Sequence, residues 1–150
     1  MAAQAWKVYN RAIRKMGAGT IALPGAVRIA LVTSASNFAT NTISLLGSIT
    51  NQVTEANGYS SSGKALASEA WTASGTLSAG QIKFDAADPV WTATGGTITS
   101  IQAAVLFMSG ATAARHVLAY ASLTSTAFTL ASGNTLTLQF NSNGIFTVAR

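Results

Sequence analysis

Residues 83–108 constrain the fold most, because they alternate short apolar runs with turn-forming residues. They predict a short strand, a tight turn holding Asp85, Asp88 and Pro89, a second strand at residues 90–93, a glycine turn and a longer strand at residues 98–108. We expect these pieces to pair with one another and to form the centre of a β-sheet. Because the last strand carries apolar side chains on both faces, it should be buried on both sides.

Similar strand patterns occupy the rest of the chain and are separated by Gly and Asn turns. Residues 26–33, 116–123 and 135–140 each alternate between two faces, as in AVRIALVT and TLTLQF. The predicted core includes Leu31, Val105, Phe107, Leu136, Leu138 and Phe140. The sequence therefore predicts one mainly β domain over residues 1–150, an antiparallel β-sandwich or barrel with a short N-terminal amphipathic helix.

Charged residues make up only 9% of the chain, against about 25% in an ordinary soluble domain. A surface so poor in charge tends to associate, so we expect it to be covered by further copies of the chain or by a larger assembly. The alternative is a neutral monomer, because Ser, Thr, Asn and Gln side chains also hydrate the surface of an exposed β-sheet.

The net charge of +5 lies wholly before residue 29, because the other cations are balanced by four carboxylates. The early cations are Lys7, Arg11, Arg14, Lys15 and Arg28. Residues 3–16 predict a short amphipathic helix, since Trp6, Tyr9, Ile13 and Met16 follow helical spacing and Gly17 would end it.

This basic segment has four interpretations: a solvated helix face, a docking element for an acidic protein surface, a nucleic-acid contact, or a membrane-surface contact, which is weak for so short a helix. Nucleic acid is disfavoured because no recognition motif accompanies the charges. The docking hypothesis assigns residues 1–19 to a helical docking segment and residues 20–150 to a β-body. Its candidate interface residues are Trp6, Lys7, Tyr9, Arg11, Arg14 and Lys15.

Residues 34–52 are rich in Ser, Thr and Asn and predict a long surface excursion with a short helix or turn. Their role stays open at this point, although loops of this length often contact partners.

The sequence offers little for catalysis. It has no cysteine and one histidine, His116, which we interpret as structural or surface-exposed. Asp85 and Asp88 are too few for a calcium loop, and Asp88 is better explained as a turn residue that bonds its own backbone. We therefore expect no catalytic residue, no cofactor and no metal site, and we expect that the protein is not an enzyme.

Two further expectations follow from apolar and aromatic residues. No apolar run reaches the length needed to cross a bilayer, so we expect no membrane partner. Trp6, Trp71 and Trp91 are interpreted as core or interface anchors rather than as a sugar-binding platform.

Four segments, taken in order, resemble a group of small virion proteins of tailed bacteriophages. They are AWKVYNRAIRK, VRIALVTSAS, EANGYSSSGKALA and KFDAADPVWTATGGTITSIQAAVLF. The resemblance covers about residues 5–108. The chain departs from it at Ser62-Gly63, where a double glycine is common, and at Pro89, which follows the second aspartate.

The resemblance implies a structural protein of the virion, assembled in the host cytoplasm. We expect a capsid decoration or cement protein that stabilises the coat lattice, with the major capsid protein as partner. It also implies a homo-oligomer, for which a trimer is the best single number. The alternatives are a neck, tail or fibre component, or a carbohydrate-binding β-sandwich.

Overall fold

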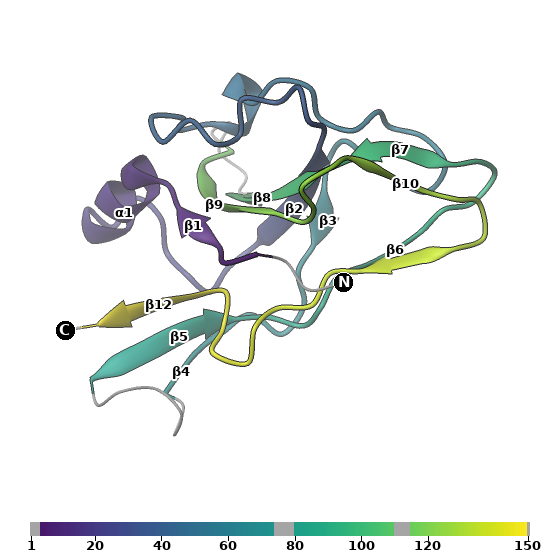
Figure 1. The fold of residues 1–150 in the computed structure, drawn as a ribbon. Helices are drawn as coiled ribbons and strands as arrows, with labels where there is room; N and C mark the ends of the chain where they lie inside the picture. The colour runs from purple at the N-terminus through teal and green to yellow at the C-terminus, as the bar shows by residue number, and fades with distance from the viewer. Residues whose placement is uncertain (1–3, 74–79, 110–114, 150) are drawn as a thin grey trace.

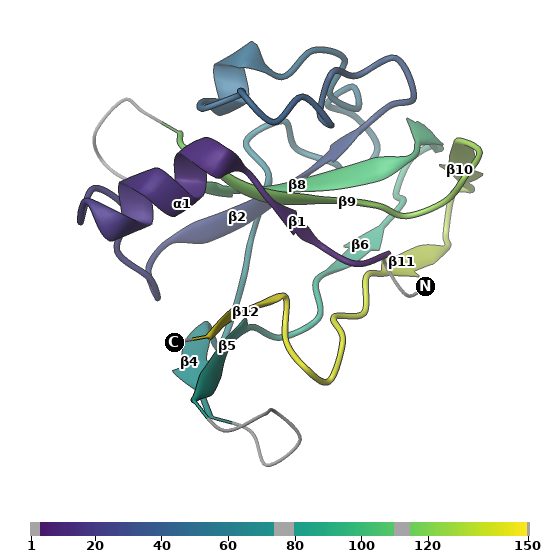
Figure 2. The ribbon, with the colours of Figure 1, turned by 60° about the vertical axis from the view of Figure 1, so that its left-hand side comes forward.

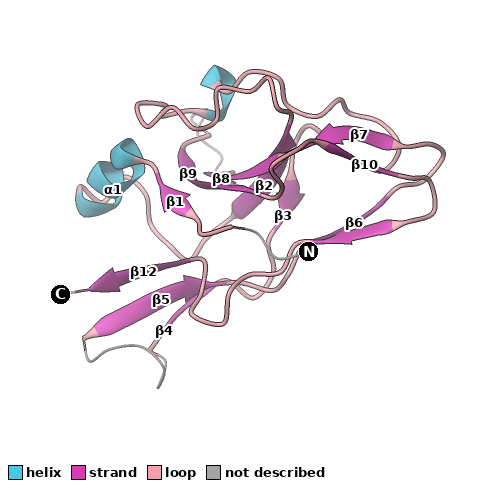
Figure 3. Cartoon of the chain, viewed as in Figure 1, coloured by secondary structure: helices cyan, strands magenta, loops and turns pink. Residues whose placement is uncertain are grey.

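The computed structural model describes residues 4–73, 80–109 and 115–149, and this part of the chain is mainly β (Figure 3). Its helices are α1 (Asn10–Gly17) and the short 3-10 helix η1 (Leu46–Ser48). Its strands are β1 (Lys7–Val8), β2 (Val27–Val32), β3 (Lys64–Ala65), β4 (Ala70–Thr72), β5 (Gln81–Asp85), β6 (Val90–Thr92), β7 (Ile98–Ile101), β8 (Ala103–Met108), β9 (Val117–Ser122), β10 (Phe128–Leu130), β11 (Thr135–Thr137) and β12 (Phe146–Ala149). The strand pairs are antiparallel.

The largest sheet has the order β1-β9-β8-β2-β3. Its middle strand, β8, pairs with β2 from Val27↔Met108 to Val32↔Ala103 and with β9 on its other side. The first five residues of β8 are buried whichever face they point to. The prediction of a strand covered on both sides is therefore confirmed for β8.

Residues 98–108 form two strands rather than one, which corrects the prediction of a single long strand. The break lies at Gln102, and Ser100 adopts a positive φ of 61°, a conformation in which a strand cannot continue regularly. The earlier half, β7, pairs with β10, whereas β8 joins the five-stranded sheet.

The pieces of residues 83–108 also do not pair with one another. Strand β5 pairs with β4 and β12, and β6 pairs with β11. The predicted tight turn is absent, because residues 86–89 are irregular backbone without a turn. Partners for these strands therefore come from elsewhere in the chain, mostly from its last third.

A second sheet of order β12-β5-β4 lies below the five-stranded sheet in Figure 1. Its aromatic side chains form a cluster in which Phe84 lies 5.3 Å from Phe146 and 5.4 Å from Trp71, measured between ring centroids. Trp71 Nε1 also donates a hydrogen bond to the Leu23 carbonyl at 2.9 Å. Because each of these sheets ends in strands without a second partner among the described residues, they do not close into a barrel, and that alternative is wrong.

The predicted core is largely confirmed. Leu31, Val105, Phe107, Leu136 and Leu138 are buried. Phe140 is only half-buried and packs against the outside of the core cluster. Residues 34–52 form the expected surface excursion with one short helix, η1, and insert Ile43 and Leu46 into the core.

Gly63 provides a test of how tightly β2 and β8 are packed. A Cβ added there would lie 2.9 Å from the Ile29 carbonyl oxygen and from the Phe107 ring, whereas one added at Gly133 would meet nothing within 4 Å. Both glycines have a positive φ, 71° and 86°. Alanine at either position should lower the free energy of unfolding by about 1–2 kcal/mol, because the backbone there is left-handed.

We expect Gly63→Ala to lower the free energy of unfolding by about 1–3 kcal/mol more than Gly133→Ala, because overpacking is added to the backbone strain. Urea denaturation of the two variants measures this difference. Equal losses would contradict the close packing at Gly63.

Candidate functional site

The basic N-terminal segment is an edge of the main sheet as well as a helix. Lys7 and Val8 pair with Tyr120 and Ala119 of β9, and the Tyr9 amide donates to the Leu118 carbonyl at 3.0 Å. The helix occupies only Asn10–Gly17, so the prediction of a helix over residues 3–16 is wrong in its first half. Sheet pairing prevails there because a short helix is marginally stable by itself.

The predicted apolar stripe of this helix is only partly buried. In α1, Ala12 is buried, but Ile13 is 56% exposed. Strand β1 pairs with β9, and α1 follows it along the same side of the sheet (Figure 2). The division into a docking segment, residues 1–19, and a β-body, residues 20–150, stays a prediction, with β1 of that segment paired to β9 of the body.

Tyr9 belongs to the core, which corrects its assignment as an interface residue. Its side chain is fully buried, its hydroxyl donates to the Phe38 carbonyl at 2.5 Å, and its ring lies 5.0 Å from that of Tyr120. Burial, together with the neighbouring Tyr120, raises the pKa of Tyr9 above its usual range.

Trp6 is half-buried and lies beside Phe140, with 5.8 Å between ring centroids. Its indole Nε1 is buried and has no hydrogen-bond partner among the described residues. A buried donor without an acceptor costs stability.

The cations of this segment differ in how they are used. Lys15 Nζ lies 3.3 Å from His116 Nε2, so it donates to the unprotonated ring nitrogen. Lys7, Arg11 and Arg14 are exposed and have no hydrogen-bond or ion-pair partner in the described part of the chain. These three charges are therefore available to a partner.

Two adjoining hollows separate the N-terminal segment from the C-terminal strand, and we call them together the edge groove. The first, of about 350 Å³, is lined by polar and apolar residues in similar measure, among them Trp6, Gln139 and Asn141. The second, of about 280 Å³, is mainly apolar and is lined by Val8, Ile13, Met16, Phe146, Thr147 and Val148. Phe146 and Thr147 line both hollows, so the groove runs along β12, which lies beside β1 and α1 in Figure 1.

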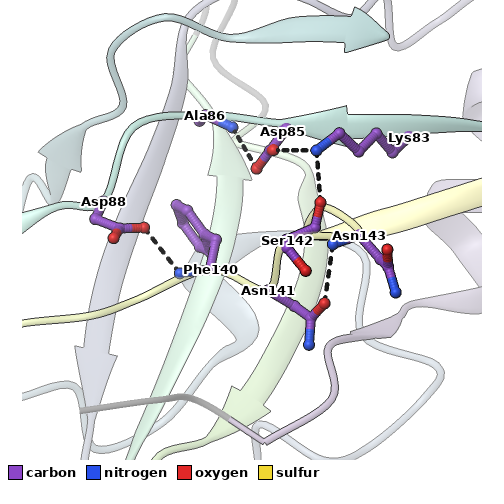
Figure 4. A network of polar contacts seen from close by, with 8 residues as sticks. All are labelled: Lys83, Asp85, Ala86, Asp88, Phe140, Asn141, Ser142 and Asn143. Atoms are coloured by element: carbon purple, nitrogen blue, oxygen red, sulfur yellow. Dashed lines mark hydrogen bonds and ion pairs between the residues drawn. The ribbon is translucent and has the colours of Figure 1, made fainter. Parts of the chain in front are cut away.

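The C-terminal wall of the edge groove is held by a polar network (Figure 4). Lys83 Nζ contacts Asp85 Oδ2 at 2.9 Å and donates to the Ser142 carbonyl at 2.7 Å. Asp88 Oδ1 accepts from the Phe140 amide at 2.8 Å, rather than from its own turn as predicted. The pairing of β6 with β11 brings Phe140 within reach of Asp88.

All four carboxylate side chains of the chain are engaged internally. Besides Asp85 and Asp88, Glu69 accepts from the amides of Gly25 and Val27 at 2.8 and 2.9 Å. Glu55 accepts from the Ser61 hydroxyl and amide, and these hydrogen bonds lower the pKa of Glu55. The chain thus has unpaired cations but no unpaired acidic side chain.

Exposed apolar side chains gather around the edge groove. Besides Ile13, Val148 is 47% exposed and Ile82, its cross-strand neighbour on β5, is 43% exposed. Neighbours directly opposite on antiparallel strands lie on the same face, so Val148 and Ile82 form one apolar patch.

Chemical groups for catalysis are scarce in the part of the chain that the structure covers. No group of three or more His, Asp or Glu side chains there could hold a metal ion. No helix of residues 4–73, 80–109 or 115–149 is long and apolar enough to cross a membrane.

Comparisons with protein-family models, with curated proteins and with solved structures find no match to this chain. The resemblance to bacteriophage virion proteins therefore rests on the four sequence segments alone.

Sequence reasoning missed the C-terminal wall of the edge groove. The alternation pattern does not single out Gln139, Asn141, Phe146 or Val148 as site residues. The cross-strand pairs Phe146↔Phe84 and Val148↔Ile82 make this wall apolar, and such pairing cannot be seen without the register.

The segment's structural role can be tested by truncation. Deleting residues 1–16 removes β1 and the buried Tyr9, so we expect a loss of unfolding free energy of at least about 3–5 kcal/mol, the usual cost of truncating a core aromatic. Changing Lys7, Arg11 and Arg14 together to Gln should cost less than about 1 kcal/mol, because exposed charges contribute little. Urea denaturation compares the two, and an unchanged midpoint for the truncated protein would show that the segment is separable.

Alkaline pH tests the burial of Tyr9. Its pKa in the folded state lies above the ordinary value of 10.0, so its contribution to stability is complete below that pH and is lost as pH rises further. We expect wild-type stability to fall between about pH 9 and pH 11, and Tyr9→Phe to fall less over the same range. Urea denaturation at about pH 9 and about pH 11 gives the free energy of unfolding of each protein. An equal loss of that free energy in the wild type and in Tyr9→Phe would contradict the burial of Tyr9.

Proposed function

We propose that this chain is a structural protein of a tailed-bacteriophage virion, namely a capsid decoration protein that stabilises the coat lattice. One arrangement supports it: Lys7, Arg11 and Arg14, which have no partner among the described residues, lie on β1 and α1 together with the exposed Ile13, beside an unpaired strand edge. Such a surface suits docking onto an acidic protein, because charge steers the approach and apolar contacts hold the complex.

The residues that carry the virion resemblance have structural roles here, which suits a scaffold. Tyr59, in the NGYS segment, accepts a hydrogen bond from the Leu31 amide at 3.0 Å. Asn57 adopts a positive φ and donates to the Thr97 carbonyl at 2.7 Å. We further propose that the stacked antiparallel sheets are the two halves of a β-sandwich.

We also propose that the protein works as a homo-oligomer, with a trimer as the expected number. The low charge content supports association, since only 9% of residues are charged. The trimer itself rests on the resemblance, because decoration proteins occupy threefold lattice points.

A second candidate function is carbohydrate binding, and one observation favours it. The first hollow of the edge groove combines Trp6 with the amide side chains of Gln4, Gln139 and Asn141. An aromatic ring with several amides could bind a sugar, so glycan binding by the isolated protein would support this alternative.

Localisation in a particle reconstruction tests the proposed function. We expect density for this chain in many copies on the coat, at threefold positions. A few copies at one vertex would instead indicate a neck, tail or fibre component. Sedimentation of the isolated protein should give a trimer, and a monomer at high concentration together with isolated monomers on the particle would contradict the oligomer.

A further inference from the structure

We infer that the edge groove binds an extended acidic segment of the coat subunit, which adds a β-strand between β1 and β12. The inference deepens the proposed function and rests on it for the identity of the coat subunit. The chemistry of the segment, however, follows from the groove itself.

The first argument is the position of two strand edges. Strand β1 pairs only with β9, and β12 pairs only with β5, in the part of the chain that the structure describes. Residues of both strands line the same hollow, Val8 on one side and Phe146 to Val148 on the other. An edge strand presents unpaired N–H and C=O groups, so an added strand can find backbone partners here.

The second argument is the lining of the edge groove. Its apolar half holds Val8, Ile13 and Val148, which suits alternate apolar side chains of an extended segment. Its other half holds Trp6, whose Nε1 lacks a partner among the described residues, and several side-chain amides. Side-chain amides both donate and accept, so those of Gln4, Gln139 and Asn141 suit the backbone of an extended segment.

The third argument is charge, and it decides between a second copy and another protein. The N-terminal wall of the groove comes from the segment that carries the unpaired Lys7, Arg11 and Arg14. A second copy carries the same net charge of +5, and its four acidic side chains are engaged internally. Charge complementarity therefore favours a foreign segment that bears free carboxylates.

The experiment uses the full chain and three synthetic octapeptides with blocked ends. The first alternates Glu and Val, the second alternates Lys and Val, and the third is the Glu–Val peptide with alternate backbone amides N-methylated. Calorimetry measures affinity, and amide hydrogen exchange measures protection of residues 7–8 and 146–149. We expect binding of the first peptide with protection of both strands, no binding of the second, and at least about ten-fold weaker binding of the third.

Two protein variants complete the test. Val148→Glu places a carboxylate in the edge groove, whereas Val90→Glu, at a side chain 40% exposed on β6 outside the groove, is the matched control. We expect Val148→Glu to weaken binding of the Glu–Val peptide by at least about ten-fold and Val90→Glu to leave it unchanged. Both positions are exposed, so both variants should fold.

Several results would overturn the inference. They are failure of the Glu–Val peptide to bind, equal binding of the N-methylated peptide, or equal binding by Val148→Glu. Dissociation of a homo-oligomer by Val148→Glu alone would identify the occupant as a second copy instead. The proposed function is tested separately, by occupancy on particles. If the wild-type protein binds the peptide but is absent from particles, only the proposed function is contradicted. If the Val148→Glu variant decorates particles at normal occupancy, only the inference is contradicted.

Discussion

The ladder between β2 and β8 is the interaction on which the rest of the structure depends. Six consecutive residue pairs join the two strands, and both faces of β8 are buried. A strand without a polar face requires cover on each side, so the chain must place further elements above and below it. The packing of Gly63 against the Ile29 carbonyl and the Phe107 ring shows how closely the neighbouring turn approaches this ladder.

Completion of that sheet determines the character of the N-terminal segment. Strand β1 pairs with β9, and Tyr9 then enters the core, where its hydroxyl bonds the Phe38 carbonyl. The backbone is thereby held in place, while Lys7, Arg11 and Arg14 are exposed and have no hydrogen-bond or ion-pair partner in residues 4–73, 80–109 and 115–149. Docking through this segment would thus use a rigid basic edge rather than a detachable helix, so little conformational entropy is lost on binding.

The carboxylates explain why the cations of the N-terminal segment have no acidic partner among the described residues. Each acidic side chain accepts hydrogen bonds that organise the fold, as Glu69 does at the start of β2 and Asp88 does at Phe140. Exposed Glu55 and Asp88 are held by such hydrogen bonds, whereas exposed Lys7, Arg11 and Arg14 have no hydrogen-bond or ion-pair partner among the described residues. This distribution links the low charge content to the proposed assembly, because such a surface attracts acidic partners and disfavours its own copies at the basic edge.

The sequence by itself determined the class of structure and most of the core. Period-two alternation at Leu31, Val105 and Leu138 predicts buried strands because neighbouring side chains on a strand point to opposite faces. It could not determine which strands pair, since a strand between irregular connections accepts partners from anywhere in the chain. The split at Ser100, the pairing of β5 with β12 and the burial of Tyr9 therefore came only from the tertiary structure. The edge groove arises in the same way, because its two walls lie more than a hundred residues apart in the sequence and meet only when both sheets have formed.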